Sequence, residues 1–317
     1  MMQHLASSLS SSAGPNRPLF PDGYDEPNGY EEGREQVTSH DVSSGGQDSD
    51  LADSAAEMPP PFDISVAHPA RIYNYWLGGK DNYEADREAG ELAVRNNPNI
   101  LPGVRANRAY LRRVVQFLAG EAGIRQFLDI GTGLPTAENT HEVAQAIAPE
   151  SRVVYVDNDP IVLAHARALL TSTPEGATAY IDADAQDTSA ILQSAAETLD
   201  FSKPIAVMAL MILQYVPDAD HPHEIVRQLM QAVPSGSYLA ISDTTRDIDT
   251  ERVSGTTAQL NTRMGPARMT LRSRDEIAGF LDGLELVEPG LVPLPEWRAL
   301  ANPTFVIPCY AAVGRKP

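Results

Sequence analysis

Short apolar runs alternate with helical patterns through the middle of the chain. Five runs have the length and apolar continuity of buried strands: 127–130, 152–157, 177–181, 204–213 and 237–242. The segments between them repeat apolar residues at helical spacing, and Pro160 stands where one of these helices should begin. Strands that alternate with helices in this way predict a mostly parallel sheet covered by helices on both faces.

The alternation stops after the fifth run. Residues 243–270 show no clear strand, and we interpret them as a substrate cap, with a plain loop as the alternative. Ser273 and Glu276 have the spacing of a capping box, which predicts the start of another helix. Two late strands, 284–291 and 304–313, follow without a helical pattern between them, so we expect them to pair as an antiparallel hairpin.

The chain before the first run divides into two parts. Residues 1–60 are rich in Ser, Gly, Pro and acidic residues, which predicts a disordered tail, because such a segment cannot bury enough surface to offset its ordering entropy. Helical patterns follow at 72–77, 83–95 and 105–119. We therefore expect one domain over residues 61–317, with a helical segment at 61–124 ahead of a core at 125–317.

Composition narrows the classes of function. The net charge of −19 leaves no basic surface for a nucleic-acid backbone, so we expect no nucleic-acid partner. No apolar run has the length of a membrane span and the first residues lack a signal-peptide pattern, which favours a cytoplasmic protein without a membrane partner. The single cysteine, Cys309, excludes a disulfide framework. His221 and His223 lack an obvious third ligand, so we expect no metal site.

The first strand runs into a glycine turn. Asp129 precedes Gly131 and Gly133, and a helical pattern follows, so the turn would present free N–H donors to a bound nucleotide. Thr136 occupies the third glycine position of the dinucleotide fingerprint, and the acid that ends the next strand, Asp157, comes later than in an NAD site. A carboxylate at Asp129 would repel a pyrophosphate but attract an amine. S-adenosylmethionine (SAM), which has an amine, a sulfonium and a ribose, therefore suits these residues better than NAD.

Three segments carry a family resemblance: HPARIYNYWLGGKDNY at 68–83, FLDIGTGLPT at 127–136 and VVYVDNDP at 153–160. In this order they resemble a family of class I SAM-dependent methyltransferases, over essentially residues 62–314. The resemblance implies an α/β fold with a Rossmann-like, seven-stranded, mostly parallel sheet, an antiparallel C-terminal hairpin and an N-terminal helical lid. It also implies SAM as the cofactor, without indicating the methyl acceptor.

The resemblance further implies a set of cofactor contacts. Asp157 would accept hydrogen bonds from both ribose hydroxyls, because its two oxygens match two adjacent donors. The other implied contacts are Asp129, Gly131, Thr132 and Gly133 at the methionine end, Asn158, Asp184 and Ala185 at the adenine, and Met211, Leu213 and Gln214 beneath the methyl group. Gln186 departs from the family, whose members often carry a basic residue there. From the residues alone, Asp157 and Asp184 could instead cap the helices that follow them.

The segment 68–82 mixes aromatic and polar residues and supports two interpretations. Its apolar positions fit a short helix that packs on the core and ends at Gly78 and Gly79. Alternatively, the hydroxyl of Tyr73 and the exposed backbone of the two glycines would suit a lid that contacts the cofactor.

The hypothesis that follows is a SAM-dependent methyltransferase with a small-molecule acceptor. Positioning the acceptor would supply most of the catalysis, and a general base is needed only if the acceptor loses a proton. Tyr73, Tyr215 and His68 are candidates of equal standing, so the base stays unassigned, and His141 is interpreted as a partly exposed helix residue. The alternatives are a regulatory module that binds SAM or S-adenosylhomocysteine (SAH) without turnover and, less favoured, an NAD-dependent oxidoreductase.

Overall fold

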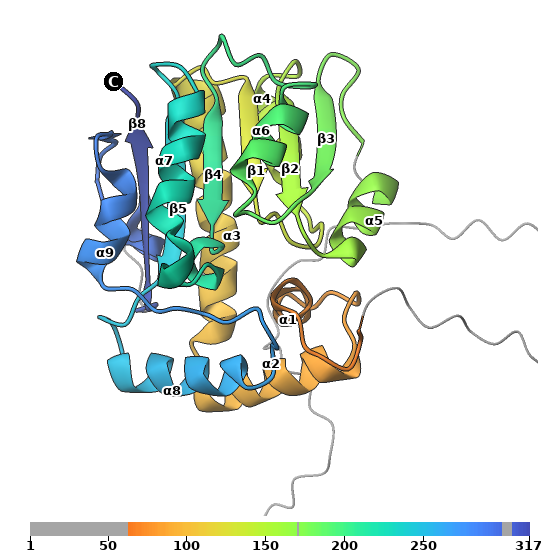
Figure 1. The fold of residues 1–317 in the computed structure, drawn as a ribbon, viewed down its shortest axis with the longest axis vertical. Coiled ribbons are helices and arrows are strands. Elements are labelled where there is room, and N and C mark those ends of the chain that lie inside the picture. The colour runs from red at the N-terminus through yellow and green to blue at the C-terminus, as the bar shows by residue number, and fades with distance from the viewer. Residues whose placement is uncertain (1–62, 170, 300–305) are drawn as a thin grey trace, which may run out of the picture. The chain divides into compact units, whose positions relative to one another are not determined.

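A sheet with parallel and antiparallel parts organises the chain (Figure 1). The computed structural model describes residues 63–169, 171–299 and 306–317. The strands of this part are β1 (Gln126–Ile130), β2 (Arg152–Asp157), β3 (Ala177–Asp182), β4 (Ala206–Leu210), β5 (Tyr238–Thr244), β6 (Glu285–Leu286), β7 (Val292–Pro293) and β8 (Cys309–Arg315). The expected tail over 1–60 and the start of the last expected strand, 304–305, lie outside the described residues.

The strand order is β3-β2-β1-β4-β5-β8-β6, with β7 paired to β8 off this path. Strands β3, β2, β1, β4 and β5 are parallel, and β1 lies at their centre, with Asp129 beside Tyr155 of β2 and Met208 of β4. The chain order reverses at β1, which opens a crevice outside the carboxyl ends of β1 and β4. The expected Rossmann-like, mostly parallel sheet is therefore confirmed, but the described residues form eight strands instead of the seven expected.

The antiparallel end of the sheet is confirmed in its pairing but not in its strand lengths. Strand β8 lies between β5 and β6 and is antiparallel to β5, β6 and β7. The single strand expected at 284–291 is wrong: the chain forms β6, turns, and forms β7 instead. Pro289 has no N–H to donate to a neighbouring strand, and Gly290 has a φ of 86°, so the backbone cannot continue as an extended strand through these two residues.

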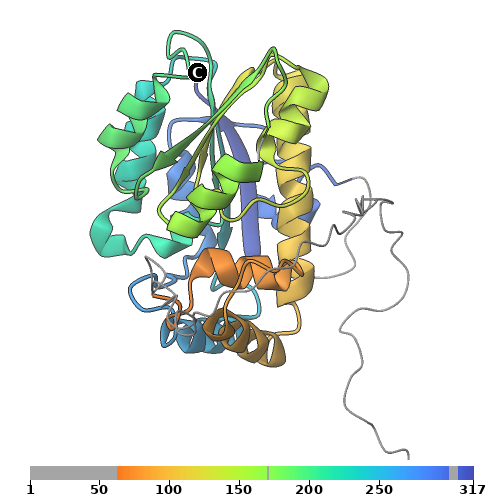
Figure 2. The same ribbon diagram turned by 90° about the vertical axis from the view of Figure 1, so that its right-hand side faces the viewer.

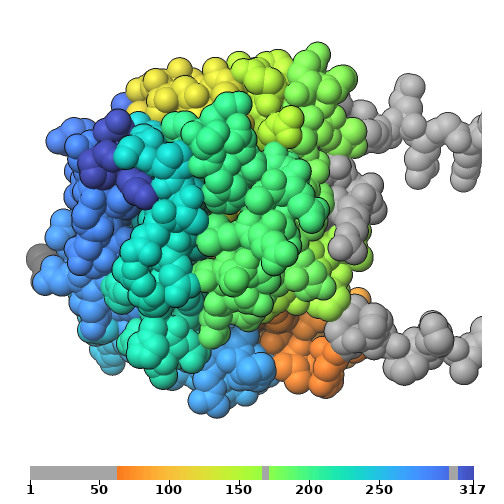
Figure 3. All heavy atoms as spheres, turned by 45° about the horizontal axis from the view of Figure 1, so that its top comes forward, coloured from red at the N-terminus to blue at the C-terminus, as the bar shows by residue number. Residues whose placement is uncertain are grey.

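Helices cover both faces of the sheet, as Figure 2 shows. Helices α3 (Ile100–Gln116) and α4 (Thr140–Ile147) pack on one face with Phe127 and Val153, and α6 (Thr188–Ala195), α7 (Pro222–Ala232) and α9 (Arg274–Ala278) pack on the other with Leu128 and Val154. Alternate residues of each strand thus enter two separate cores. In the space-filling view of Figure 3, α6 in green and α7 in teal cover the second face. Helix α5 (Pro160–Leu169) follows β2.

Short helical turns complete the elements of the described residues. A π-helical turn, Phe117–Glu121, extends α3, and 3-10 turns are formed by Leu213–Tyr215, Asp218–Asp220, Gly279–Leu281 and Leu294–Glu296. The turn at 213–215 directly follows β4 and therefore lies at the carboxyl edge of the sheet.

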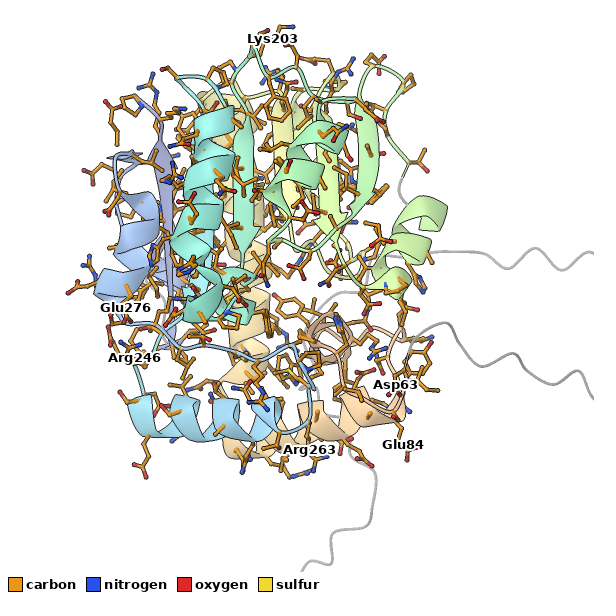
Figure 4. All side chains as sticks on the ribbon, viewed as in Figure 1. Asp63, Glu84, Lys203, Arg246, Arg263 and Glu276 are labelled. Atoms are coloured by element: carbon orange, nitrogen blue, oxygen red, sulfur yellow. The ribbon has the colours of Figure 1, made fainter. Side chains whose placement is uncertain are left out.

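A layer of helices lies below the carboxyl edge: α1 (Pro69–Trp76), α2 (Glu84–Asn96) and α8 (Thr250–Asn261). Ile72, Ala89 and Leu260 share one apolar cluster, so the N-terminal helices and α8 form a common body. Figure 4 shows Glu84 and Arg263 in this layer, whereas Lys203 lies at the opposite edge of the sheet.

Helix α8 corrects the expectation that residues 243–270 are irregular. Its buried positions, Val253, Thr256, Thr257 and Leu260, have helical spacing. Two of the four are threonines, so the apolar pattern is broken and the period is hidden from the sequence. Residues 243 and 244 belong to β5 instead.

Candidate functional site

The glycine turn between β1 and α4 lies over the end of β2. Gly131 and Gly133 both have a φ of 69°, which favours glycine, and the N–H of Gly131 donates to the carbonyl of Val156 at 2.8 Å. A Cβ on Gly131 would stand 2.4 Å from Cγ1 of Ile212, whereas a Cβ on Gly133 would meet nothing within 4 Å. The first glycine is thus required by packing against the loop after β4, and the second borders open space.

Asp157 ends β2 beside this turn and is 8% exposed. Its Oδ2 accepts the N–H of Gly133 at 2.8 Å, and its Oδ1 accepts the N–H of Asp159 at 3.0 Å. Each oxygen keeps a lone pair, and burial raises the pKa of Asp157. The first turn of α5 is bonded by Asp159, whose Oδ1 accepts from Ile161 at 2.8 Å. The capping alternative therefore applies to Asp159, and Asp157 is available to a ligand.

Asp129 is the second buried carboxylate of the site. It is 5% exposed, and Thr140 Oγ1 donates to its Oδ2 at 2.6 Å. Burial raises the pKa of Asp129 to about 6. A cationic group placed beside it would replace the lost solvation, so this position suits an ammonium ligand. Thr132 lies in the same turn, with its N–H 3.2 Å from the carbonyl of Val156.

Polar residues that follow β2 and β3 lie next to each other at the carboxyl edge of the sheet. Asn158 Nδ2 donates to Asp184 Oδ2 at 2.9 Å, and the N–H of Gln186 donates to Asp184 Oδ1 at 2.9 Å. Ala185 is half-buried between them. The residue that caps α6 is Asp187, not Asp184, since Asp187 Oδ1 accepts from Ala190. The structure thus brings Asn158, Asp184 and Ala185 together beside Asp157.

The loop after β4 forms the other side of the crevice. Met211 has a φ of 58°, and its N–H donates to the carbonyl of Ser242 at 2.8 Å. Gln214 is 2% exposed, and its Oε1 accepts the N–H of Thr244 at 3.2 Å. Burial raises the pKa of Tyr215 to about 12. This loop is therefore bonded to the end of β5 by both backbone and side chain.

The N-terminal helices lie over the crevice, but their polar groups are largely used within the protein. Tyr73 Oη donates to the carbonyl of Val104 at 3.2 Å and accepts from Asn107 Nδ2 at 3.1 Å. Burial raises the pKa of Tyr73 to about 12, so its hydroxyl is protonated at neutral pH. Tyr73 and Tyr215 are both poor bases for this reason.

Gly78 and Gly79 end α1 by close packing. Gly78 has a φ of 82°, and a Cβ on Gly79 would stand 2.3 Å from Nδ2 of Asn74. Asn74 Oδ1 accepts from the N–H of Asp81 at 3.1 Å and from Asn82 at 2.9 Å. The expected helix end is confirmed, and both glycines have a local structural reason that does not involve a ligand.

Sequence reasoning missed a buried ion cluster behind the β4 loop. Arg272 is 1% exposed and donates to the carbonyls of Leu213 at 2.8 Å and Val216 at 2.7 Å. It also contacts Asp218 at 2.9 Å and Asp243 at 3.4 Å. Burial raises the pKa of Asp243 to about 7. No local pattern distinguishes Arg272 from a surface arginine, because its partners are far away in the sequence.

One histidine expectation changes. His141 is 2% exposed, so the interpretation as a partly exposed residue is wrong: its N–H donates to Tyr155 Oη, and its Nδ1 lies 2.8 Å from the same oxygen. His221 and His223 line a cavity of about 600 Å³ between α7 and α9 together with Arg272. Among the described residues, no group of three or more His, Cys, Asp or Glu side chains is arranged to hold a metal ion.

Comparisons with known proteins identify the family of the chain. A family model described as S-adenosyl methyltransferase matches residues 55–317. A DUF574 family protein from Streptomyces avermitilis is 48% identical with a TM-score of 0.77, and the match covers 80% of this chain and 100% of that one. A putative methyltransferase from Thermobifida fusca is 39% identical with a TM-score of 0.75, over 83% of this chain and 99% of that one.

Two further observations concern similar curated proteins and helices that could cross a membrane. No curated protein matches the chain. Over the residues that the structure describes, none of the helices combines the length and the apolar character needed to cross a membrane.

Proposed function

The chain belongs to the S-adenosyl methyltransferase family, and from this premise we propose that it transfers the methyl group of SAM to a small-molecule acceptor in the crevice between β1 and β4. SAM is the cofactor, and it supplies a methyl group activated by a sulfonium. Asp157 would hold the ribose, Asp129 and the 131–133 turn the methionine end, and Asn158, Asp184 and Ala185 the adenine. Met211, Leu213 and Gln214 would lie beneath the methyl group.

The observation that carries this proposal is the geometry of Asp157. Two backbone N–H groups hold its oxygens at the end of β2, and Gly133 beside it borders open space. A carboxylate fixed in this way can accept two adjacent hydroxyls without any rearrangement of the protein. A ribose has such a pair of hydroxyls, and no other buried carboxylate of the crevice is held by the glycine turn within the described residues.

Catalysis in this site would depend on positioning. The loop after β4 is bonded to Ser242 and Thr244, which supports a fixed position for Met211 and Gln214 beneath the methyl group. Tyr73 and Tyr215 keep their protons at neutral pH, so they would not remove a proton from the acceptor.

The test is a calorimetric titration of the full chain with SAM, SAH and NADH, beside Asp157→Asn and Asp182→Asn. Asp182 is the matched control, because it stands opposite Asp157 in the β2–β3 register but is exposed. We expect SAM and SAH to bind to the wild type, Asp157→Asn to weaken binding at least about tenfold, and Asp182→Asn to leave it unchanged. NADH binding without SAM binding would overturn the proposal.

A second measurement separates an enzyme from a regulatory module. Full-length chain with methyl-labelled SAM is incubated with fractionated small-molecule extracts, with Asp157→Asn as the background. Transfer of label to a small molecule by the wild type alone would support the proposal. Tight SAH binding with no transfer in any fraction would favour a module that binds the cofactor without turnover.

A further inference from the structure

Two histidine–aspartate pairs join the N-terminal helices to the segment that follows β2. His68, just before α1, lies with Nδ1 2.8 Å from Oδ2 of Asp159. His165 of α5 lies with Nε2 3.6 Å from Oδ1 of Asp81, in the loop between α1 and α2. The two pairs differ in burial, since Asp159 is 3% exposed and Asp81 is 38% exposed. The first pair is therefore desolvated on its acidic side, and the second is solvated on both sides.

An apolar contact lies between these pairs. Leu134 of the glycine turn and Ile161 and Val162 of α5 form a buried cluster, and Ala70 of α1 and Tyr83 pack against it. The N-terminal helices therefore cover both segments that border the proposed ribose position.

The first pair is connected directly to the ribose carboxylate. The N–H of Asp159 donates to Asp157 Oδ1, and the N–H of Gly133 donates to Asp157 Oδ2. Burial alone would raise the pKa of Asp159, but the hydrogen bond and charge of His68 lower it overall. Asp159 is thus ionised, and it attracts a protonated imidazole more strongly than a neutral one.

We propose that His68 is a positioning residue of the cofactor site, which through its ion pair with Asp159 fastens the N-terminal helices over Asp157 and retains the bound nucleoside. This inference rests on the proposed function, because it takes the ligand at Asp157 to be SAM or its product SAH. His68 acts through Asp159 and needs no contact with the methyl acceptor.

The charged groups around His68 are limited in number. Asp159 and Asp157 face it from the β2–α5 segment, and Asp86 of α2 accepts its backbone N–H at 2.8 Å. Arg71 of α1 lies 3.2 Å from Asp86, and its positive charge partly offsets the attraction of these acidic groups for a protonated His68. The acidic groups outnumber this cation, so the pair is strongest when the imidazole is protonated. Retention should therefore be weaker when the imidazole is neutral.

The test measures the dissociation constant of SAH for the full chain at about pH 6 and about pH 8.5, in the wild type and in His68→Gln. Glutamine can still donate a hydrogen bond to Asp159 but carries no charge. The backbone bond from His68 to Asp86 remains, so the variant should keep the position of α1. We expect the ratio of variant to wild-type dissociation constants to be about fivefold at the lower pH and to approach one at the higher pH.

Two control variants test whether the change in the ratio of SAH dissociation constants is specific to the pair of His68 with Asp159. His165→Gln removes the solvated pair at the same contact and should change SAH binding less than twofold at either pH, because many exposed ion pairs contribute nothing measurable. Adding Asp159→Asn to His68→Gln should cause no further pH-dependent loss, because the two side chains act as one pair.

A third readout does not depend on ligand. Hydrogen exchange of residues 68–83 in the free chain should be faster in His68→Gln than in the wild type at about pH 6, and the same in both at about pH 8.5. A ratio of dissociation constants that does not change with pH, or an equal effect of His165→Gln, would overturn the role of His68. A wild type that binds NADH but not SAH would overturn the proposed function and this inference with it, whereas normal SAH binding with a flat ratio would overturn this inference alone.

Discussion

The two sides of the crevice are built by different means. The donor side, defined as residues 129–133 and 157–159, is held by backbone N–H groups, as in the bonds from Gly133 and Asp159 to Asp157. The transfer side, defined as residues 211–218 with Asp243 and Arg272, is held by a side chain from 59 residues away, Arg272 on Leu213. The donor side is thus held by main-chain groups of the glycine turn and of β2, while the transfer side also depends on a side chain from a distant segment.

This difference changes how each side responds to substitution. A backbone cradle tolerates a side-chain change elsewhere, because its donors are part of the main chain. The transfer side depends on buried charges, and removing one of them leaves its partners uncompensated. The following predictions test this contrast, from the largest expected effect to the smallest.

Arg272→Met should lower the free energy of unfolding by about 3–5 kcal/mol, because Asp243 and two loop carbonyls would lose their buried donor. The measurement is urea denaturation at neutral pH. Arg246→Met is the matched control, since the pair of Arg246 with Glu276 is about half exposed and lies at the surface near α9 (Figure 4). Equal effects of the two substitutions would mean that the buried cluster does not hold the transfer side.

Asp243→Asn should change how stability depends on pH. The pKa of Asp243 is raised to about 7 in the folded chain, above its unfolded value of about 3.9, so its stabilising contribution is complete below about pH 4 and is lost as the pH rises to 7. The free energy of unfolding of the wild type should therefore fall relative to the variant by about 2–4 kcal/mol across this range. Denaturation at several pH values checks this, and parallel curves would contradict it.

Gly131→Ala and Gly133→Ala should separate folding from binding. Both residues have the same φ, so both variants carry about 1 kcal/mol of backbone strain. Only Gly131→Ala adds a clash with Ile212, which should bring its total cost to about 2–4 kcal/mol. Gly133→Ala fills the open space and should weaken SAH binding more than it lowers stability. Thermal denaturation and calorimetry of both variants measure the two effects, and an identical loss of stability would exclude the contact with Ile212.

Asp129 should release a proton when SAM binds at low pH. Its pKa is raised to about 6 in the free chain, and a bound ammonium favours the ionised form, so at about pH 5 binding should release up to about one proton, and at about pH 8 almost none. Calorimetry in buffers with different ionisation enthalpies counts these protons. Asp129→Asn should abolish the release, and an unchanged count in that variant would place the titrating group elsewhere.

The sequence predicted the donor side more completely than the transfer side. The succession of strands along the chain, the glycine turn and the acid at the end of β2 are all local features of the sequence, and the structure has each of them. The hidden helix α8 and the broken strand at 284–291 were missed because threonines masked one pattern and a Pro-Gly turn interrupted the other. His141 was expected to be partly exposed, because its partner Tyr155 lies on another element and cannot be inferred from the local sequence.

Sequence alone determined the five parallel strands, the glycine turn and the family motifs, because strand continuity, helical period and glycine conformation depend on neighbouring residues. Tertiary structure decided how charged and polar side chains are used. Arg272 is buried with Asp243, His68 is paired with Asp159, and Tyr73 bonds Asn107. Each of these contacts joins residues from separate elements, and the solvation that sets the charge of a carboxylate or an imidazole depends on the packing around it.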